Sequence, residues 1–168
     1  ELKLRIFGNY CNLSCYTCHP YNSSTREKEL KKIGFYERYA YDETEKAPGK
    51  QQYEKIAENI LDNIDRVCKI LFTGGEPLLL PRHHDFIERI SDEQAKNIKV
   101  SYITNFTELN HKGVYFLDKI KRFKAANFLI SCDHHGDKLS YIRYPIDVAQ
   151  FERNLDKLAE EKIKTNNF

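Results

Sequence analysis

Three cysteines lie within eight positions near the start of the chain, and they give the clearest chemical signal in the sequence. They are Cys11, Cys15 and Cys18, in a Cys-x3-Cys-x2-Cys pattern. Thiolate sulfur is a soft ligand that selects zinc, Cu(I) or iron–sulfur centres. A structural zinc site needs four protein ligands, and the adjacent His19 could supply the fourth. Three thiolates on a four-iron cube would instead leave one iron open to a small chelating molecule.

A second motif follows a short apolar run further along the chain. Residues 70–72 predict a buried strand, and the sequence Thr-Gly-Gly-Glu-Pro follows it directly over residues 73–77. Gly74 and Gly75 allow the backbone to approach a ligand closely, and Glu76 offers an acceptor for an ammonium group. A Gly-Gly turn is also common after ordinary strands. The motif therefore indicates a ligand site mainly because it follows the cysteine segment in the chain.

The hydrophobic pattern predicts alternating strands and helices, an arrangement that would bring both motifs to one edge of a sheet. Strands are expected at residues 2–7, 70–72, 98–104 and 127–132, and helices at 51–66, 84–95, 112–123 and 146–164. Residues 8–24 form a cysteine-bearing loop, and the charged, Tyr-rich stretch 25–49 has no clear pattern, although a short helix could lie within it. The alternation indicates parallel strands with helices packed outside, and such folds build their sites at the carboxyl ends of the strands.

The predicted fold class is α/β, a partial parallel β/α barrel truncated after about four βα units, because so few strands cannot close a barrel of this kind. An open doubly wound sheet is the alternative architecture. The chain begins at Glu1 and contains no methionine. We therefore expect residues 1–168 to be one incomplete domain, with its later strands and any further domain outside this sequence.

The cysteine segment just after a first strand resembles the cluster loop of the radical SAM superfamily, and the Gly-Gly-Glu-Pro motif resembles a second signature of that superfamily. The resemblance implies that the three cysteines hold a 4Fe-4S cluster whose open iron binds S-adenosyl-L-methionine. The implied contacts to the methionine moiety come from Gly74, Gly75, Glu76 and Pro77. The implied activity is reductive cleavage of S-adenosylmethionine to methionine and a 5′-deoxyadenosyl radical, which abstracts hydrogen from a substrate.

Polar residues at the ends of the third and fourth predicted strands match the superfamily less specifically. Asn105 ends the third strand, and Ser131 and Asp133 end the fourth. The resemblance implies that they contact the ribose and methionine parts of the cofactor, although such residues are also ordinary at the starts of loops. The Tyr-Ile-Arg sequence ending at Arg143 resembles members with SPASM or twitch extensions, in which this arginine helps to hold the cofactor carboxylate. Arg143 would equally suit a surface position.

Several residues depart from the family pattern or stand outside it. Thr17 precedes the third cysteine where an aromatic or large apolar residue is common, so the usual packing against adenine is not predicted. His134 and His135 stand where glycine is common; a histidine could donate a proton to substrate, but solvated loop residues are the favoured interpretation. The same interpretation is given to two other histidines, His83 and His84. Two isolated cysteines are expected to be small core residues outside any cluster: Cys68 and Cys132.

Composition argues against several classes of function. The chain has 27 Lys and Arg residues against 25 Asp and Glu, spread along its length, which gives no nucleic-acid footprint. No apolar run is long enough to span a membrane, and no signal peptide is visible. The odd cysteine count favours free thiols in a reducing compartment over disulfides. The sequence is therefore expected to be that of a soluble, cytoplasmic protein.

Three functions remain open. The favoured one is a radical SAM enzyme, for which the resemblance implies a flavodoxin- or ferredoxin-type reductant protein and a peptide or small-molecule substrate. A peptidyl substrate is preferred by analogy alone, because fold and cofactor do not fix the substrate. The alternatives are a structural zinc-binding module, which leaves Gly-Gly-Glu-Pro unexplained, and a non-catalytic scaffold that binds the cluster.

Overall fold

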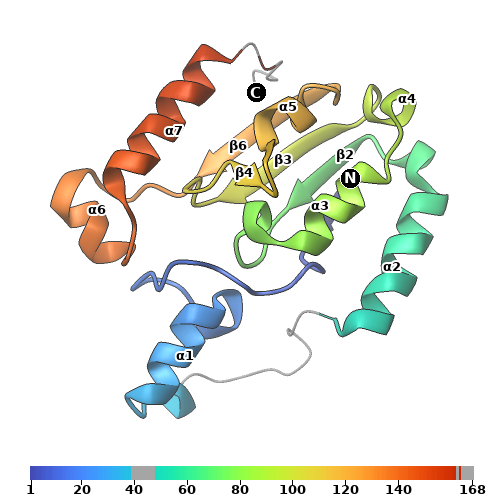
Figure 1. The fold of residues 1–168 in the computed structure, drawn as a ribbon. Coiled ribbons are helices and arrows are strands. Elements are labelled where there is room, and N and C mark those ends of the chain that lie inside the picture. The colour runs from blue at the N-terminus through green and yellow to red at the C-terminus, as the bar shows by residue number, and fades with distance from the viewer. Residues whose placement is uncertain (39–47, 162, 164–168) are drawn as a thin grey trace.

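The computed structural model describes residues 1–38, 48–161 and 163, and it is built on one four-stranded parallel sheet (Figure 1). The strands are β1 (Leu2–Leu4), β2 (Lys69–Phe72), β3 (Lys99–Thr104) and β6 (Ala125–Ile130). Their order is β1-β2-β3-β6, and every neighbouring pair is parallel. The sheet is open and its strand order never reverses, which confirms the partial α/β barrel and disfavours the doubly wound alternative.

Helices connect these strands and follow the last of them. They are α1 (Ser24–Lys32), α2 (Lys50–Asp62), α3 (Pro81–Glu88), α4 (Asp92–Ala95), α5 (Phe116–Ile120), α6 (Gly136–Ile142) and α7 (Val148–Glu160). Short 3₁₀ turns lie at Pro20–Asn22, Tyr36–Arg38, Ile64–Arg66 and Pro77–Leu79, and β4 (Asn110–His111) pairs with β5 (Val114–Tyr115) in a hairpin. In the part of the chain that the structure describes, no helix is long and apolar enough to cross a membrane.

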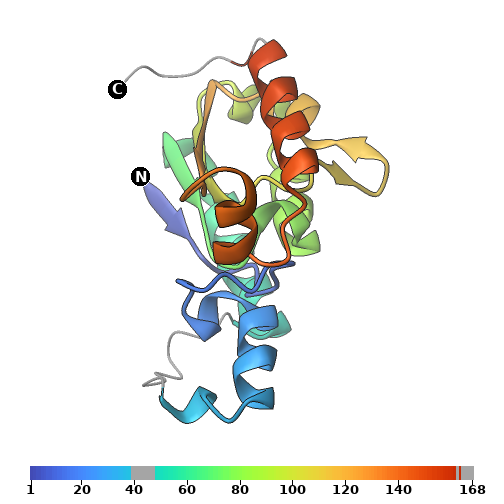
Figure 2. The ribbon, with the colours of Figure 1, turned by 90° about the vertical axis from the view of Figure 1, so that its left-hand side faces the viewer.

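Helices cover one face of the sheet (Figure 2). A core rich in aromatic side chains lies between these helices and the sheet. Phe72 and Tyr102 pair across β2 and β3 and stack with ring centroids 4.9 Å apart, and Phe86 of α3 is buried with them. Because successive strand residues point to opposite faces, Ile103 and Leu129 point the other way, and they are 36% and 49% exposed. This half-open face is the inside of the partial barrel.

Two predicted helices differ from the structure for local reasons. The helix expected at 84–95 is broken into α3 and α4, because the Ser91 side chain accepts from the Gln94 N–H and caps a new helix in a capping box. The helix expected at 112–123 starts only at α5, because Lys112 and Gly113 both have positive φ and form the turn of the hairpin. The predicted end of the last helix, residue 164, lies outside the described residues.

The two helices that the pattern did not predict flank the cysteine-bearing loop. The Ser23 side chain caps α1 by accepting from the Arg26 N–H at 3.1 Å. α1 buries only Leu30, and α6 buries only Leu139. A helix with a single buried side chain has no apolar stripe, so hydrophobic periodicity cannot reveal it.

Candidate functional site

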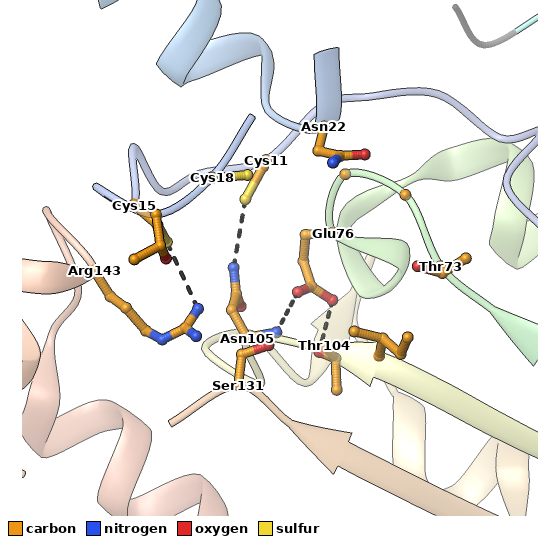
Figure 3. Close-up of a pocket in the computed structure, with 14 residues that line it drawn as sticks. Cys11, Cys15, Cys18, Asn22, Thr73, Glu76, Thr104, Asn105, Ser131 and Arg143 are labelled. Carbon is orange, nitrogen blue, oxygen red and sulfur yellow. Dashed lines mark hydrogen bonds between the residues drawn. The ribbon is translucent and has the colours of Figure 1, made fainter. Parts of the chain in front are cut away.

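The loops that follow the four parallel strands meet at the carboxyl edge of the sheet and line a cavity of about 270 Å³ (Figure 3). Apart from Pro77 and Asp133, all the predicted site residues line it. Those that do are Cys11, Cys15, Cys18, Gly74, Gly75, Glu76, Asn105, Ser131 and Arg143. Residues from distant parts of the sequence are therefore brought to one place, as the βα alternation predicted.

The cysteine-bearing loop has little regular structure of its own and is held by its neighbours. Two of its thiols are buried and the third is half-buried. On one side, Thr25 Oγ1 at the start of α1 donates to Cys11 O at 2.6 Å. On the other side, the Ser14 N–H donates to Tyr144 O, just after α6, at 2.6 Å. The two helices that were not predicted thus hold the loop in place.

The chemistry of the thiols fits an iron–sulfur centre. Burial raises the pKa of all three, that of Cys11 to about 12, so the free thiols are neutral. Asn105 Nδ2 lies 3.6 Å from Cys11 Sγ, and Arg143 Nη1 lies 3.7 Å from Cys15 Sγ (Figure 3). A metal binds the thiolate and releases the thiol proton. Three cysteines around one cavity are a suitable donor set for a 4Fe-4S cluster that keeps one iron open.

The zinc alternative needs a fourth protein ligand, which would be His19 or another residue. The His19 ring instead packs on the Tyr21 ring at 4.1 Å, and its Nδ1 accepts from the Tyr21 N–H at 3.5 Å. Within residues 1–38, 48–161 and 163, no group of three or more His, Cys, Asp or Glu side chains is arranged to hold a metal ion. His19 therefore has another partner in the described chain, and the three thiols are not gathered there around a single metal ion, whether zinc or iron.

The two glycines of the second motif bring it against the first. Gly74 and Gly75 have φ of +91° and +58°. A Cβ on Gly75 would overlap the Tyr10 carbonyl oxygen, and one on Gly74 would lie 2.5 Å from Arg5 Cγ. The Glu76 N–H donates to the same Tyr10 oxygen at 2.8 Å. The glycines therefore allow close packing between the loops that follow β1 and β2, which carries Glu76 into the cavity lined by the cysteines.

The Glu76 carboxylate is 1% exposed and is held by three neutral donors. Oε1 accepts from Thr104 Oγ1 at 2.7 Å and from the Leu78 N–H at 3.1 Å, and Oε2 accepts from the Asn105 N–H at 2.6 Å. Burial raises the Glu76 pKa to about 7, although these hydrogen bonds act in the opposite direction. A cation in the cavity would relieve the free-energy cost of the buried charge.

Arg143 enters the cavity with its guanidinium already oriented. Its Nε lies 2.7 Å from Asp133 Oδ2, and its side chain is only 13% exposed. Asp133 thus supports Arg143 rather than lining the cavity itself. A planar guanidinium held on one side can still present its other N–H groups to a carboxylate.

Comparison with protein families shows where these motifs belong. The family model described as the radical SAM superfamily matches residues 6–168, a range that includes both motifs. The chain belongs to the radical SAM superfamily. The resemblance seen in the cysteine segment and in Gly-Gly-Glu-Pro is therefore confirmed.

Curated relatives of this radical SAM chain are much longer than it is. The cysteine-type anaerobic sulfatase-maturating enzyme of Clostridium novyi is 28% identical over 170 residues, which cover 99% of this chain and 39% of that protein. The enzyme of the same name from Clostridium perfringens is 28% identical over 144 residues, 82% of this chain and 33% of that protein. An uncharacterised protein of Methanocaldococcus jannaschii is 31% identical over 121 residues, 67% of this chain and 32% of that protein. The chain thus spans about two-fifths or less of these relatives. No solved structure matches it.

The interpretation of His83 and His84 as solvated loop residues is wrong for this radical SAM chain. They are 0% and 1% exposed and lie in α3. His83 Nε2 is 3.1 Å from Tyr102 Oη, and His84 Nε2 is 2.8 Å from Leu78 O. Burial lowers both pKa values, that of His84 to about 4. The two neutral rings therefore pack beside the turn that carries Glu76.

The isolated cysteines also differ from expectation. Cys68 and Cys132 are exposed rather than buried, because each lies just outside its strand, the first before β2 and the second after β6. His134 and His135 are exposed loop residues, as expected.

Sequence reasoning missed polar residues that shape this radical SAM site without matching a motif. Thr104 bonds the Glu76 carboxylate, and its place at the end of β3 was the available signal. Asn12, Thr107 and Asn154 form hydrogen bonds around Asn105. They carry no signal of their own, because an asparagine or threonine in a polar stretch has no distinctive pattern.

Proposed function

We propose that this chain is the cluster- and cofactor-binding part of an enzyme that reductively cleaves S-adenosylmethionine. The observation that carries the proposal is that Cys11, Cys15, Cys18 and Glu76 line one cavity. The three thiolates hold a 4Fe-4S cluster and leave one iron for the cofactor. When bound, the cluster supplies the electron that splits S-adenosylmethionine into methionine and a 5′-deoxyadenosyl radical, which takes a hydrogen atom from the substrate.

Two charged residues of the cavity bind the two charged groups of the methionine moiety. Glu76 receives the ammonium group, because its carboxylate is buried, fixed by neutral donors and able to gain from a cation. Arg143 receives the carboxylate, because Asp133 already orients its guanidinium. The remaining proposed contacts around the cofactor are Gly74, Gly75 and Ser131, which line the cavity, whereas Pro77 follows Glu76 outside it.

The substrate is proposed to be peptidyl. Two relatives are named as sulfatase-maturating enzymes, and a sulfatase is a protein. Ile103 lines the cavity on the half-open inner face of the sheet, so this face offers an apolar approach for a substrate side chain. A SPASM or twitch extension would belong to the length of the relatives that this chain does not cover. A flavodoxin- or ferredoxin-type protein in the reducing cytoplasm, where free thiols persist, is the proposed reductant.

Anaerobic reconstitution of the whole protein with iron and sulfide tests the proposal. We expect about four irons per chain to depend on the three cysteines, together with brown absorbance, and 5′-deoxyadenosine after reduction with dithionite in the presence of S-adenosylmethionine. Cys11→Ala should lose the cluster, whereas Cys68→Ala removes an exposed thiol away from the cavity and should retain it. A wild-type protein that binds no iron, or whose stoichiometric zinc survives reconstitution, would refute the proposal. Cluster binding without 5′-deoxyadenosine would favour the non-catalytic scaffold instead.

A further inference from the structure

The side-chain amide of Asn105 is engaged entirely by protein groups. Nδ2 donates to Cys11 Sγ at 3.6 Å and to Asn12 Oδ1 at 2.9 Å. Oδ1 accepts from the N–H and the Oγ1 of Thr107, at 3.1 and 2.8 Å. A primary amide has two N–H donors and two acceptor lone pairs. The amide therefore has no hydrogen-bonding group left for a cofactor. The group it bonds that can take part in chemistry is the sulfur of Cys11.

A closed ring of hydrogen bonds fixes the angle of this amide. Asn12, next to Cys11 in the chain, accepts from Asn105 and donates its own Nδ2 to Thr107 Oγ1 at 3.0 Å. Thr107 Oγ1 completes the ring by donating to Asn105 Oδ1. Each bond polarises the next, so the three bonds strengthen one another. The ring ties the cysteine-bearing loop to the turn after β3 and aims Nδ2 at the sulfur (Figure 3).

The turn after β3 is itself held from α7. Asn154 is 1% exposed and donates from Nδ2 to both Phe106 O and Thr107 O at 2.9 Å, while its Oδ1 accepts from Gln150 Nε2 at 2.8 Å. Phe106 has a φ of 57°, in the left-handed region that a residue with a Cβ adopts only when its surroundings impose it. Asn154 is part of those surroundings, so a helix far along the sequence helps to set the conformation that presents Asn105.

We propose that Asn105 is a positioning residue for the iron–sulfur cluster and that Asn154 holds it in place from α7. The inference rests on the proposed function, because it needs Cys11 to be a cluster ligand. An N–H aimed at a ligating sulfur stabilises the additional negative charge of the reduced cluster, and this raises the reduction potential. A residue that only shaped the turn would leave the potential unchanged.

The test is the midpoint potential of the cluster, measured by EPR-monitored redox titration of the reconstituted whole protein. Asn105→Leu keeps a similar volume but removes the donor, so the potential should become more negative at unchanged iron content. Asn154→Leu should give a smaller shift in the same direction. Asn63→Ala is the matched control, because it removes an exposed amide that bonds Asn59 O at the end of α2, and it should leave the potential unchanged.

A second variant keeps the inference testable if Asn105→Leu does not fold. Thr107→Val breaks two bonds of the ring but keeps the Thr107 N–H, and it should also make the potential more negative. Wild-type potentials in the folded variants would overturn the inference. Weaker binding of S-adenosylmethionine at an unchanged potential would identify Asn105 as a cofactor contact instead. A wild-type protein that holds no cluster would refute the proposed function itself.

Discussion

Glu76→Gln should weaken the binding of S-adenosylmethionine while barely changing the shape of the site, because it replaces one carboxylate oxygen by an NH₂ group. The amide oxygen can keep the position of Oε1, where donors from Thr104 and Leu78 converge. The NH₂ group then faces the Asn105 N–H that Oε2 accepts in the wild type. It also faces the ammonium group of the cofactor. In the wild type the carboxylate oxygen accepts a hydrogen bond from this ammonium group, whereas in the variant the NH₂ and ammonium groups are both donors and cannot bond to each other.

The expected loss follows from which bonds change on binding. The bond between Glu76 and the Asn105 N–H is lost in both the free and the bound variant, so it largely cancels from the affinity. The bond to the ammonium group exists only in the bound state, and hydrogen bonds to charged groups contribute about 1.5–3 kcal/mol. The dissociation constant should therefore rise by about 10- to 150-fold. Folding stability changes less, because the variant also removes a buried carboxyl whose pKa rises from 4.5 to about 7 on folding, and this rise makes the wild type progressively less stable as the pH increases from about 4.5 to about 7.

Isothermal titration calorimetry of the cluster-loaded protein under anaerobic conditions measures this affinity. Glu93→Gln is the matched control, because Glu93 is exposed in α4, near the amino end of β3 and away from the cavity. This control should bind S-adenosylmethionine as the wild type does. An affinity of Glu76→Gln within about two-fold of the wild type would mean that the carboxylate does not receive the ammonium group.

Three further substitutions examine the surroundings of the site. Gly75→Ala should lower the free energy of unfolding by about 3 kcal/mol in urea, because its Cβ would overlap Tyr10 O at positive φ. The control Gly113→Ala, at positive φ in open space, should lower it by about 1 kcal/mol. Equal losses in the two variants would contradict the close packing at Gly75. Arg143→Gln should weaken S-adenosylmethionine binding by about 1.5–3 kcal/mol in calorimetry, and the exposed Arg66→Gln should not; wild-type affinity in Arg143→Gln would exclude the proposed carboxylate contact. His84→Gln should remove a pH dependence of folding stability, because the His84 pKa falls from 6.5 to about 4 on folding. As the pH falls from about 7 to about 5, the wild type should lose about 2 kcal/mol of unfolding free energy relative to the variant. Parallel curves of stability against pH would show that this histidine is not buried as a neutral ring.

The sheet and the edge that carries the site were predictable because both follow from local patterns. Short apolar runs marked the strands, their alternation with helices required parallel pairing, and parallel pairing placed the loops after the strands together. The buried histidines were not predictable in this way. His83 packs against the rings of Phe7 and Phe72, and its Nε2 lies near Tyr102 Oη. A polar residue on a short helix is usually solvated, and only the packing of α3 onto the sheet reverses that preference.

The cysteine spacing identifies the type of ligand, but the orientation of each sulfur depends on residues far away in the sequence. The backbone at Cys11 is held by Thr25, and its sulfur receives an N–H from Asn105. The turn that carries Asn105 is held in turn by Asn154 of α7. None of these pairings can be predicted from local periodicity, because the sequence around a loop asparagine does not indicate whether its side chain contacts solvent or a sulfur atom. If the N–H groups around the sulfurs set the reduction potential, as we propose, the same Cys-x3-Cys-x2-Cys segment on other neighbouring loops would bind the same cluster at a different potential. The neighbouring loops, rather than the cysteine motif alone, then determine how readily the cluster gives up its electron.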